Sequence, residues 1–394
     1  MDGKRFITKL RLRNLLSFGP DAEEFELEPL NVLIGPNASG KSNVIEAISL
    51  LQAAPDDIQE PIRRGVGIRE WLWKGGEKKP EAEIDATVDW GRTPALRHLL
   101  RIAGPSDTFE LVRESITASP ESGGDVREHY QYHRGQARLW SSAPGVAQRS
   151  LAADQLRPNH SILAQIRDPA NYAQLAYLGE KFRRIHIFRD WDTSRDGDLR
   201  RAQFPDLQSD FLTEDANNLA LVINNLQNRC VGLQERIESE LSRFYPRTKK
   251  VGVRVEGGTV QLLLHEDGLR DPIPATRMSD GTLRYLCLLS ILLHPEPPPL
   301  VCIEEPEIGL HPDIIVRLAH LMEEASERMQ LIVTTHSDAL VSALSGIPEA
   351  VAICERDEGG STKIRRLDRE DLEEWLEGYT LGDLWIRGEL GGNP

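Results

Sequence analysis

Cysteine is scarce in this chain of 394 residues, and no two cysteines form a C-x-x-C pair. Disulfide frameworks and structural zinc sites need several closely spaced cysteines, so the sequence argues against both. Cysteines inside apolar runs behave as small hydrophobic residues. This usage is typical of a reducing cytoplasm. The cysteines are Cys230, Cys287, Cys302 and Cys354.

Long hydrophobic runs are also missing. The longest, "YLCLLSILL" at residues 285–293, falls well short of the roughly 20 residues that span a bilayer. The N-terminal stretch "MDGKRFITKLRLRN" has no apolar core of the kind found in signal peptides. We therefore expect a soluble cytoplasmic protein with no membrane partner.

Positive charge is in deficit, with 47 Lys and Arg against 62 Asp and Glu, a net charge of −15. Such a balance excludes a protein that binds nucleic acid over its whole surface. A local basic patch remains open, and residues 180–201 are its best candidate. The ordinary interpretation of that run is a solvated face with mixed ion pairs. The length allows one large or two medium domains.

A glycine-rich turn is the strongest motif present. In "LNVLIGPNASGKSNVIEAISLLQ", residues 30–52, a short apolar run precedes G-x-x-x-x-G-K-[ST] and apolar residues at helical spacing follow it. Backbone amides of such a loop wrap an anion at a helix N-terminus. Lys41 reaches the β- and γ-phosphates and Ser42 offers a hydroxyl to Mg²⁺. No guanine-reading N/T-K-x-D motif follows, which favours ATP. The predicted nucleotide-binding residues are Gly35, Pro36, Asn37, Ala38, Ser39, Gly40, Lys41, Ser42 and Asn43.

Residues 300–337 have the pattern of two strands joined by a helix. The apolar run 300–303 follows a proline block, which ends the preceding helix, and Pro312 stands at a first helical position. Apolar residues then recur at helical spacing, and "LIVTTHS", residues 331–337, has the character of another strand. Such a unit makes the two strands parallel, with a right-handed crossover.

Two adjacent carboxylates, Glu304 and Glu305, end the first of these strands. In a P-loop ATPase an acid there helps to hold Mg²⁺, and a second acid orients and deprotonates the attacking water. We assign Glu304 to the metal and Glu305 to the water, and we count Lys41 as a third reacting group. His336 can hydrogen-bond the γ-phosphate. Without the glycine-rich loop, these residues would indicate only a strand that reaches the surface and a structural histidine.

The stretch "RMSDGTLRYLCLLSILLHP", residues 277–295, places Ser279, Asp280 and Gly281 before an apolar helix. Taken alone, it is a good helix N-cap. Taken with the preceding motifs in this order, it resembles the L-S-G-G-Q signature loop of ABC-type ATPases. The resemblance implies that Ser279 and the Gly281 amide face the γ-phosphate bound by the other protomer.

More narrowly, the chain resembles the RecF/SMC/OLD-like branch of ABC-type ATPases, specifically the bacterial AAA_21 ATPases. The motifs that carry the resemblance are "TKLRLRNLLSF" (8–18), "GPNASGKSN" (35–43), "SDGTLR" (279–284), "EEPEIGLHP" (304–312) and "TTHSD" (334–338). The resemblance implies ATP and Mg²⁺ as cofactors and a head-to-tail, ATP-dependent homodimer or higher oligomer. It also implies ATP hydrolysis, work in DNA repair or anti-phage defence, and a separately encoded effector protein.

Two residues depart from the wider superfamily. Glu304 stands where aspartate is usual, and Asp280 replaces a glycine near the phosphate. The superfamily also has a glutamine that contacts Mg²⁺ and the attacking water. We assign that role to Gln165, in preference to Gln131 and Gln136.

The predicted fold is α/β, with an ABC-type ATPase core built on a mixed β-sheet, a helical signature lobe and a β-rich insertion. Residues 1–55 form the first part of the core and residues 271–394 the second. Residues 56–205 form the insertion, and residues 206–270 a helical arm and a hairpin. Within these parts we expect strands at 82–90 and 127–140, helix at 215–245 and a hairpin at 249–268 around two glycines.

Three other functions are retained as alternatives. The chain could be an ATP-clamped scaffold that holds an effector with negligible hydrolysis, or the ATPase subunit of a transporter. The long middle segment counts against the transporter. Direct DNA binding is a third, and it predicts salt-sensitive binding that weakens when Arg183, Arg184 and Arg195 are neutralised.

Overall fold

The computed structural model describes residues 3–76, 81–118, 125–142, 148–151, 153–229 and 232–392. Within this part of the chain, no helix has both the length and the apolar character to cross a membrane. The strands are β1 Ile7–Arg13, β2 Phe25–Glu26, β3 Leu30–Ile34, β4 Ala82–Val88, β5 Leu96–Ala103, β6 Glu110–Ala118, β7 Arg127–His133, β8 Gln136–Leu139, β9 Arg149–Leu151, β10 His186–Phe188, β11 Thr248–Glu256, β12 Thr259–Glu266, β13 Ile273–Pro274, β14 Leu300–Glu304, β15 Gln330–Thr334, β16 Val351–Arg356 and β17 Thr362–Arg366. The helices are α1 Lys41–Ala53, α2 Glu60–Arg64, α3 Ile68–Trp71, α4 Ile162–Gln165, α5 Ala173–Arg183, α6 Leu219–Arg229, α7 Leu233–Phe244, α8 Asp280–Leu292, α9 Pro312–Ser326, α10 Asp338–Ala343, α11 Arg369–Leu376 and α12 Leu381–Ile386.

The central sheet brings the two ends of the chain together. Its strand order is β10-β14-β15-β3-β16-β17, and only β17 runs antiparallel to its neighbour. Leu331 of β15 pairs with Leu30 of β3, although the two residues come from opposite ends of the chain. β3 and β15 are buried at every residue, as their continuous apolar sequences predict for strands covered on both faces. The predicted mixed sheet is therefore confirmed.

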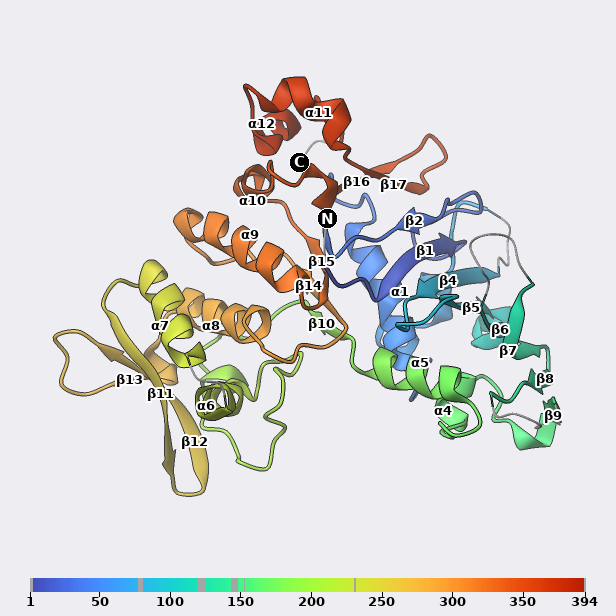
Figure 1. The fold of residues 1–394 in the computed structure, drawn as a ribbon, viewed down its shortest axis with the longest axis horizontal. Coiled ribbons are helices and arrows are strands. Elements are labelled where there is room, and N and C mark those ends of the chain that lie inside the picture. The colour runs from blue at the N-terminus through green and yellow to red at the C-terminus, as the bar shows by residue number, and fades with distance from the viewer. Residues whose placement is uncertain are drawn as a thin grey trace.

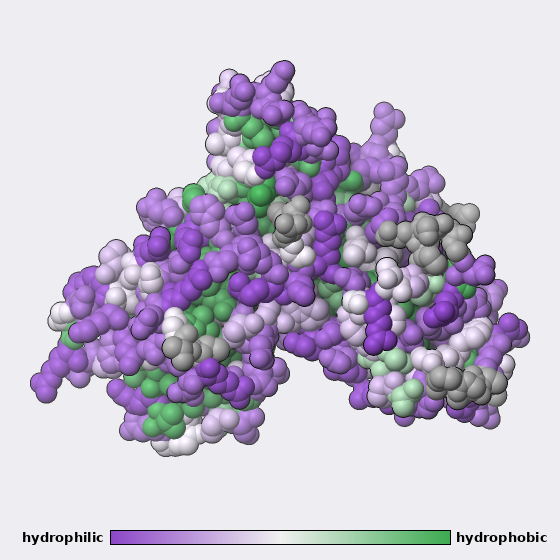
Figure 2. Space-filling model, viewed as in Figure 1, coloured by the Kyte–Doolittle hydropathy of each residue, from purple (hydrophilic) through white to green (hydrophobic). Residues whose placement is uncertain are grey.

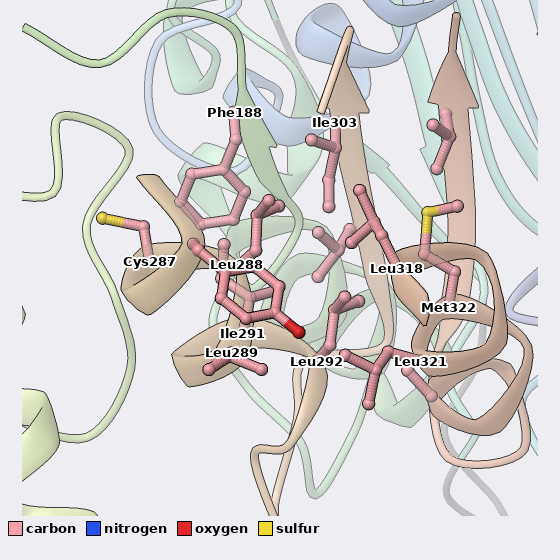
Figure 3. Close-up of a cluster of buried hydrophobic side chains, with 14 of the residues drawn as sticks. Phe188, Cys287, Leu288, Leu289, Ile291, Leu292, Ile303, Leu318, Leu321 and Met322 are labelled. Atoms are coloured by element: carbon pink, nitrogen blue, oxygen red, sulfur yellow. The ribbon is translucent and has the colours of Figure 1, made fainter. Parts of the chain in front are cut away.

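Helices α8 and α9 cover one face of this sheet. Eleven of the thirteen residues of α8 are buried, which fits its apolar sequence on all sides. Figure 3 shows Leu288 and Ile291 of α8 beside Phe188 of β10, with Leu318 of α9 on the side of Ile303 of β14 and Met322 of α9 beneath the next strand. The packing fixes α8, and so the loop before it, relative to the sheet.

A second sheet lies on the other side of α1. Its order is β2-β1-β4-β5-β6-β7-β8-β9, and all its pairs are antiparallel. Val44 and Ile48 of α1 share a buried cluster with Leu10 of this sheet and with Leu33 and Ile332 of the central one. α1 is therefore sandwiched between the two sheets, which holds the phosphate-binding loop before it on both sides.

The third lobe contains α6, α7, α8 and the sheet β11-β12-β13 (Figure 1). The helical segment predicted at 215–245 is two helices, because α6 ends at Arg229 and α7 begins after Gly232, whose φ is 82°. Cys230 lies outside the described residues. The predicted hairpin is β11 and β12, joined at Gly257 and Gly258. Figure 2 shows a notch between this lobe and the lobe of the eight-stranded sheet.

The predicted segments 1–55 and 56–205 do not each form a separate layer of the structure. β1 and β2 belong to residues 1–55 but pair within the eight-stranded sheet with β4. β10 belongs to residues 56–205 but pairs with β14 in the central sheet. The strands predicted at 82–90 and 127–140 are present, the second as the hairpin β7–β8.

Candidate functional site

The phosphate-binding loop leaves β3 at Gly35 and enters α1 at Lys41. At two of its positions only glycine fits, because the backbone has a positive φ and a Cβ would collide with a neighbouring atom. Gly35 has a φ of 141°, and a Cβ there would lie 2.2 Å from the Cys354 carbonyl oxygen. Gly40 has a φ of 106°, and its Cβ would lie 2.2 Å from the Thr362 hydroxyl. The loop therefore has the tight wrap that only glycine allows at these positions.

Lys41 is turned back onto the loop itself. Its Nζ donates hydrogen bonds to the carbonyl oxygens of Gly35, at 2.7 Å, and Pro36, at 3.0 Å. Burial lowers the pKa of Lys41, while the nearby Cys354 and Glu305 oppose that shift. The Ser39 hydroxyl is buried and has no hydrogen-bond partner among the described residues. A buried ammonium and an unsatisfied hydroxyl in a loop of amides suit a phosphate group.

Glu304 lies at the carboxyl end of β14, beside the first turn of α1. Ser42 donates a side-chain hydrogen bond to it, and Arg189 Nε lies 3.1 Å from its Oε1. Burial raises the pKa of Glu304, and the hydrogen bond from Ser42 and the charge of Arg189 oppose that rise. The structure thus places the two predicted metal-binding oxygens, on Ser42 and Glu304, in contact.

Glu305 adopts a backbone φ of 47°, a value that residues other than glycine seldom adopt. Its amide is held by the Thr334 carbonyl oxygen at 2.9 Å, at the end of β15. The turn directs its carboxylate toward the next strand, where His336 Nε2 lies 3.8 Å from Glu305 Oε1. Strained backbone of this kind is concentrated at functional sites. The predicted water-activating acid and the histidine predicted to hydrogen-bond the γ-phosphate are therefore neighbours.

Glu307 joins this group, although the sequence assigned it no role. Its Oε1 accepts hydrogen bonds from Thr335 Oγ1, at 2.6 Å, and from the His336 amide, at 3.0 Å. The carboxylate therefore ties the loop after β14 to the loop that carries His336. Its position two residues after Glu305, beyond a proline, was the only signal in the sequence.

The donor atoms fit a magnesium ion held jointly with a nucleotide. Among the described residues, no group of three or more His, Cys, Asp or Glu side chains could hold a metal ion. Mg²⁺ in phosphate-transfer sites needs no such cage, because phosphate oxygens and waters supply most of its octahedral shell. The adjacent Ser42 hydroxyl and Glu304 carboxylate are a donor set that fits such a shell.

The predicted signature loop begins α8. Ser279 is the N-cap, and its Oγ accepts a hydrogen bond from the Thr282 amide at 3.1 Å. A Cβ at Gly281 would lie 2.7 Å from the Gly309 carbonyl oxygen, so the helix start is packed against the loop after β14. Ser279 is exposed, and α8 and α1 lie in different lobes in Figure 1. Within one protomer, the structure does not bring Ser279 and Gly281 to the phosphate-binding loop.

Arg200, which the sequence did not single out, holds this helix start. Its guanidinium donates hydrogen bonds to the carbonyl oxygens of Ala275, at 2.9 Å, and Met278, at 2.7 Å, and it pairs with Asp280. Asp280, which stands where the superfamily has a glycine, is thus held by an ion pair with Arg200.

Gln165 is not brought to this site, so its assignment as a metal ligand has no support from the geometry. It ends the short helix α4, and its side-chain amide donates to the His160 carbonyl oxygen at 3.0 Å and accepts from the Arg157 amide at 2.6 Å. These local bonds occupy both polar atoms of the side chain. The residue that follows β10 and faces Glu304 is instead Arg189.

Comparison with known proteins agrees with this arrangement. The model of the AAA_21 family, described as "AAA domain, putative AbiEii toxin, Type IV TA system", matches residues 30–342. The match begins at β3 and runs through α10, so it includes every motif of the site. No curated protein sequence matches the chain.

Two solved structures have a similar fold. One is an SMC head bound to the C-winged helix domain of ScpA, at 15% identity and a TM-score of 0.56, covering 93% of this chain and 99% of that one. The other is an SMC head with an extended coiled coil bound to the C-terminal domain of ScpA, derived from Pyrococcus furiosus, at 14% identity and a TM-score of 0.54, covering 94% and 98%. At these identities the likeness concerns the fold, and it confirms the predicted α/β class. The family match covers most of the chain, which therefore belongs to the AAA_21 family.

Proposed function

We propose that this protein binds ATP with Mg²⁺ and hydrolyses it to ADP and phosphate. The observation that carries the proposal is the convergence of five side chains at the carboxyl ends of adjacent parallel strands. Lys41 and Ser42 follow β3, Glu304 ends β14 and is followed by Glu305, and His336 follows β15. Ligands of open parallel sheets bind at this edge.

Each residue has a role that its surroundings suit. Lys41 exchanges its bonds to the loop carbonyls for the β- and γ-phosphates, and the orphaned Ser39 hydroxyl gains a phosphate oxygen. Ser42 and Glu304 hold Mg²⁺, which neutralises charge on the phosphates when it is bound. Glu305 takes a proton from a water whose oxygen attacks the γ-phosphorus, and the bond to the bridging β–γ oxygen breaks. Glu307 keeps His336 in place to donate a hydrogen bond to the γ-phosphate.

The second part of the proposal is an ATP-dependent, head-to-tail homodimer. At the start of α8, Ser279 is exposed and Gly281 is packed against Gly309. A helix N-terminus favours an anion, so a second copy could present it to the γ-phosphate. ATP would then stabilise the dimer, and hydrolysis would release it.

Three variants test the proposal together. We expect Lys41→Ala to lose ATP binding, measured by calorimetry. We expect Glu305→Gln to bind ATP and to release phosphate about a hundredfold or more slowly, because only the base is lost. Light scattering should show a Glu305→Gln dimer with ATP and a monomer without it. Phosphate release by Glu305→Gln at the wild-type rate would exclude the assigned role of this residue.

We also infer that the nucleotide state controls a separately encoded effector, in DNA repair or anti-phage defence. Two considerations support this: the SMC heads of similar fold are bound to parts of another protein, ScpA, and the family description mentions a putative toxin. Capture of the neighbouring gene's product by Glu305→Gln with ATP, and not by Lys41→Ala, would support the inference. Equal capture by both variants would contradict nucleotide control.

A further inference from the structure

Arg189 is the residue that the fold places beside the predicted metal ligand. It directly follows β10, and Phe188 of that strand pairs with Ile303 of β14, so Arg189 stands next to Glu304. Its Nε lies 3.1 Å from Glu304 Oε1, and its Nη2 lies 2.6 Å from Glu46 Oε2. One guanidinium therefore bridges a carboxylate at the end of β14 and a carboxylate on α1.

Glu46 lies one helical turn after Ser42, on the same face of α1. The two carboxylates and the Ser42 hydroxyl consequently surround one small space. The Glu304 side chain is only 19% exposed, so its negative charge is poorly hydrated there. Arg189, which is 44% exposed, supplies a positive charge from the solvent side.

We propose that Arg189 is a positioning residue that holds Glu304 in the absence of metal and competes with Mg²⁺ for its carboxylate. The inference rests on the proposed function, since it concerns the same site. A guanidinium and a divalent cation cannot both neutralise the same buried oxygen at full strength, because they repel each other. Binding of Mg²⁺ with ATP therefore loosens the Arg189–Glu304 pair, and Glu46 retains the guanidinium near the site.

The competition predicts how the loss of Arg189 changes the affinity for ATP, and the change differs with and without Mg²⁺. Removing the positive charge leaves Glu304 and Glu46 unopposed. ATP without metal should then bind more weakly, because its phosphates meet two bare carboxylates. ATP with Mg²⁺ should bind at least as well as to the wild type, because the competing cation is gone. If Arg189 instead contacted the phosphates, its loss would weaken binding with metal too.

The experiment is a thermodynamic cycle on the full chain. The dissociation constant of a fluorescent ATP analogue is measured in EDTA and in saturating Mg²⁺. The ratio of the constant in EDTA to the constant in Mg²⁺ is then compared among variants. We expect Arg189→Gln and Arg189→Ala to raise this ratio about three- to tenfold, the effect of one partly exposed ion pair. Arg195→Ala is the matched control, since it removes an exposed arginine of the same segment and should leave the ratio unchanged.

Two failures are distinguishable. If the wild type binds the analogue in neither condition, the proposed function fails. If the wild type binds it normally and the ratio is unchanged or smaller in both Arg189 variants, this inference fails and the proposed function stands. Thermal melts in EDTA verify folding, and Arg189→Lys, which keeps the charge without the two-pronged fork, should give a ratio between those of the wild type and Arg189→Ala.

Discussion

Glu307 makes both of its hydrogen bonds to the loop after β15, which is where the γ-phosphate is expected. We predict that Glu307→Ala lowers the rate of phosphate release about ten- to a hundredfold, because His336 loses the anchor of its own amide. ATP affinity, which depends on Lys41, should change little. Single-turnover hydrolysis and calorimetry separate the two effects.

The control for this variant is Glu307→Gln, whose amide oxygen can still accept from Thr335 and from the His336 amide. It should retain most of the activity. Equal loss in both variants would mean that the charge of Glu307, and not its hydrogen bonds, is what the site uses.

His186 gives a pH dependence that is separate from the nucleotide site. Its ring packs against Phe188 and Phe211, with centroids 6.2 Å and 4.8 Å away. Burial, and then the charge of Arg184, lowers the pKa of His186 from 6.5 to about 4. Between these values the unfolded chain binds a proton that the folded chain does not, so the folded state loses stability as pH falls through this window.

We therefore predict that His186→Phe reduces the acid sensitivity of the protein. At pH 4 the variant should retain about 1–3 kcal/mol of unfolding free energy that the wild type loses relative to pH 7, allowing for partial exposure of the ring. Urea unfolding at the two pH values measures this difference. His133→Gln, on the exposed end of β7, should behave as the wild type. Parallel losses in His186→Phe and the wild type would contradict the prediction.

At the scale of elements, Ser279 is a helix N-cap, and the proposed function adds a second, separable role for it. As the N-cap of α8 it accepts the Thr282 amide, and loss of such a cap costs about 1 kcal/mol. We predict that Ser279→Ala lowers the melting temperature, whereas Ser279→Asp keeps the cap. Ser279→Asp should nevertheless abolish ATP-dependent dimerisation, because its carboxylate repels the γ-phosphate. Melting curves and light scattering in the Glu305→Gln background test both effects.

Asp368 offers a matched control at the start of α11, where it accepts the Glu370 amide at 2.9 Å. Asp368→Ala should destabilise the protein comparably and leave dimerisation intact. A stable Ser279→Asp variant that still dimerises with ATP would show that this helix start does not face the nucleotide.

The sequence predicted those elements whose signals are local. The phosphate-binding loop, the strand before Glu304 and the hairpin around Gly257 and Gly258 each carry their turn residues and apolar period within about twenty positions. β10 has only three residues, so no period could reveal it. Its place beside β14, which brings Arg189 to Glu304, is a property of the topology.

The glutamine assignment has no support from the geometry because the sequence does not reveal which segment the topology places beside β14. Gln165 was chosen by its neighbours in sequence, but the fold sends α4 to the eight-stranded sheet, where Glu114 of β6 accepts the Ile162 amide at 2.8 Å. Glu307 was likewise invisible as a functional residue, because its partners Thr335 and His336 lie 28 and 29 positions away.

At the scale of the whole molecule, the residues of the proposed nucleotide site are divided between lobes. The phosphate-binding loop and the acids meet on the central sheet, whereas α8 projects its N-terminus from the third lobe (Figure 1). The bonds of Arg200 to Ala275, Met278 and Asp280 hold that N-terminus in a fixed, exposed position. In the proposed dimer, the phosphate-binding loop of one protomer and the start of α8 of the other would form each site, and a symmetric pair would complete two such sites.

This division predicts complementation between two inactive variants. Lys41→Ala lacks a working phosphate-binding loop and Ser279→Asp lacks a working signature loop, so neither should hydrolyse ATP alone. In a heterodimer, the loop of the Ser279→Asp protomer meets the intact signature of the Lys41→Ala protomer, and one complete site results. An equal mixture should recover up to about a quarter of the wild-type rate, since half of the dimers are mixed and each has one site. Lys41→Ala mixed with Glu305→Gln should recover nothing, because both defects then lie on the sheet side of the site. No recovery in the first mixture would mean that each chain hydrolyses ATP within itself. Recovery in the second mixture would mean that Lys41 and Glu305 act from different protomers, and either result would exclude the head-to-tail arrangement.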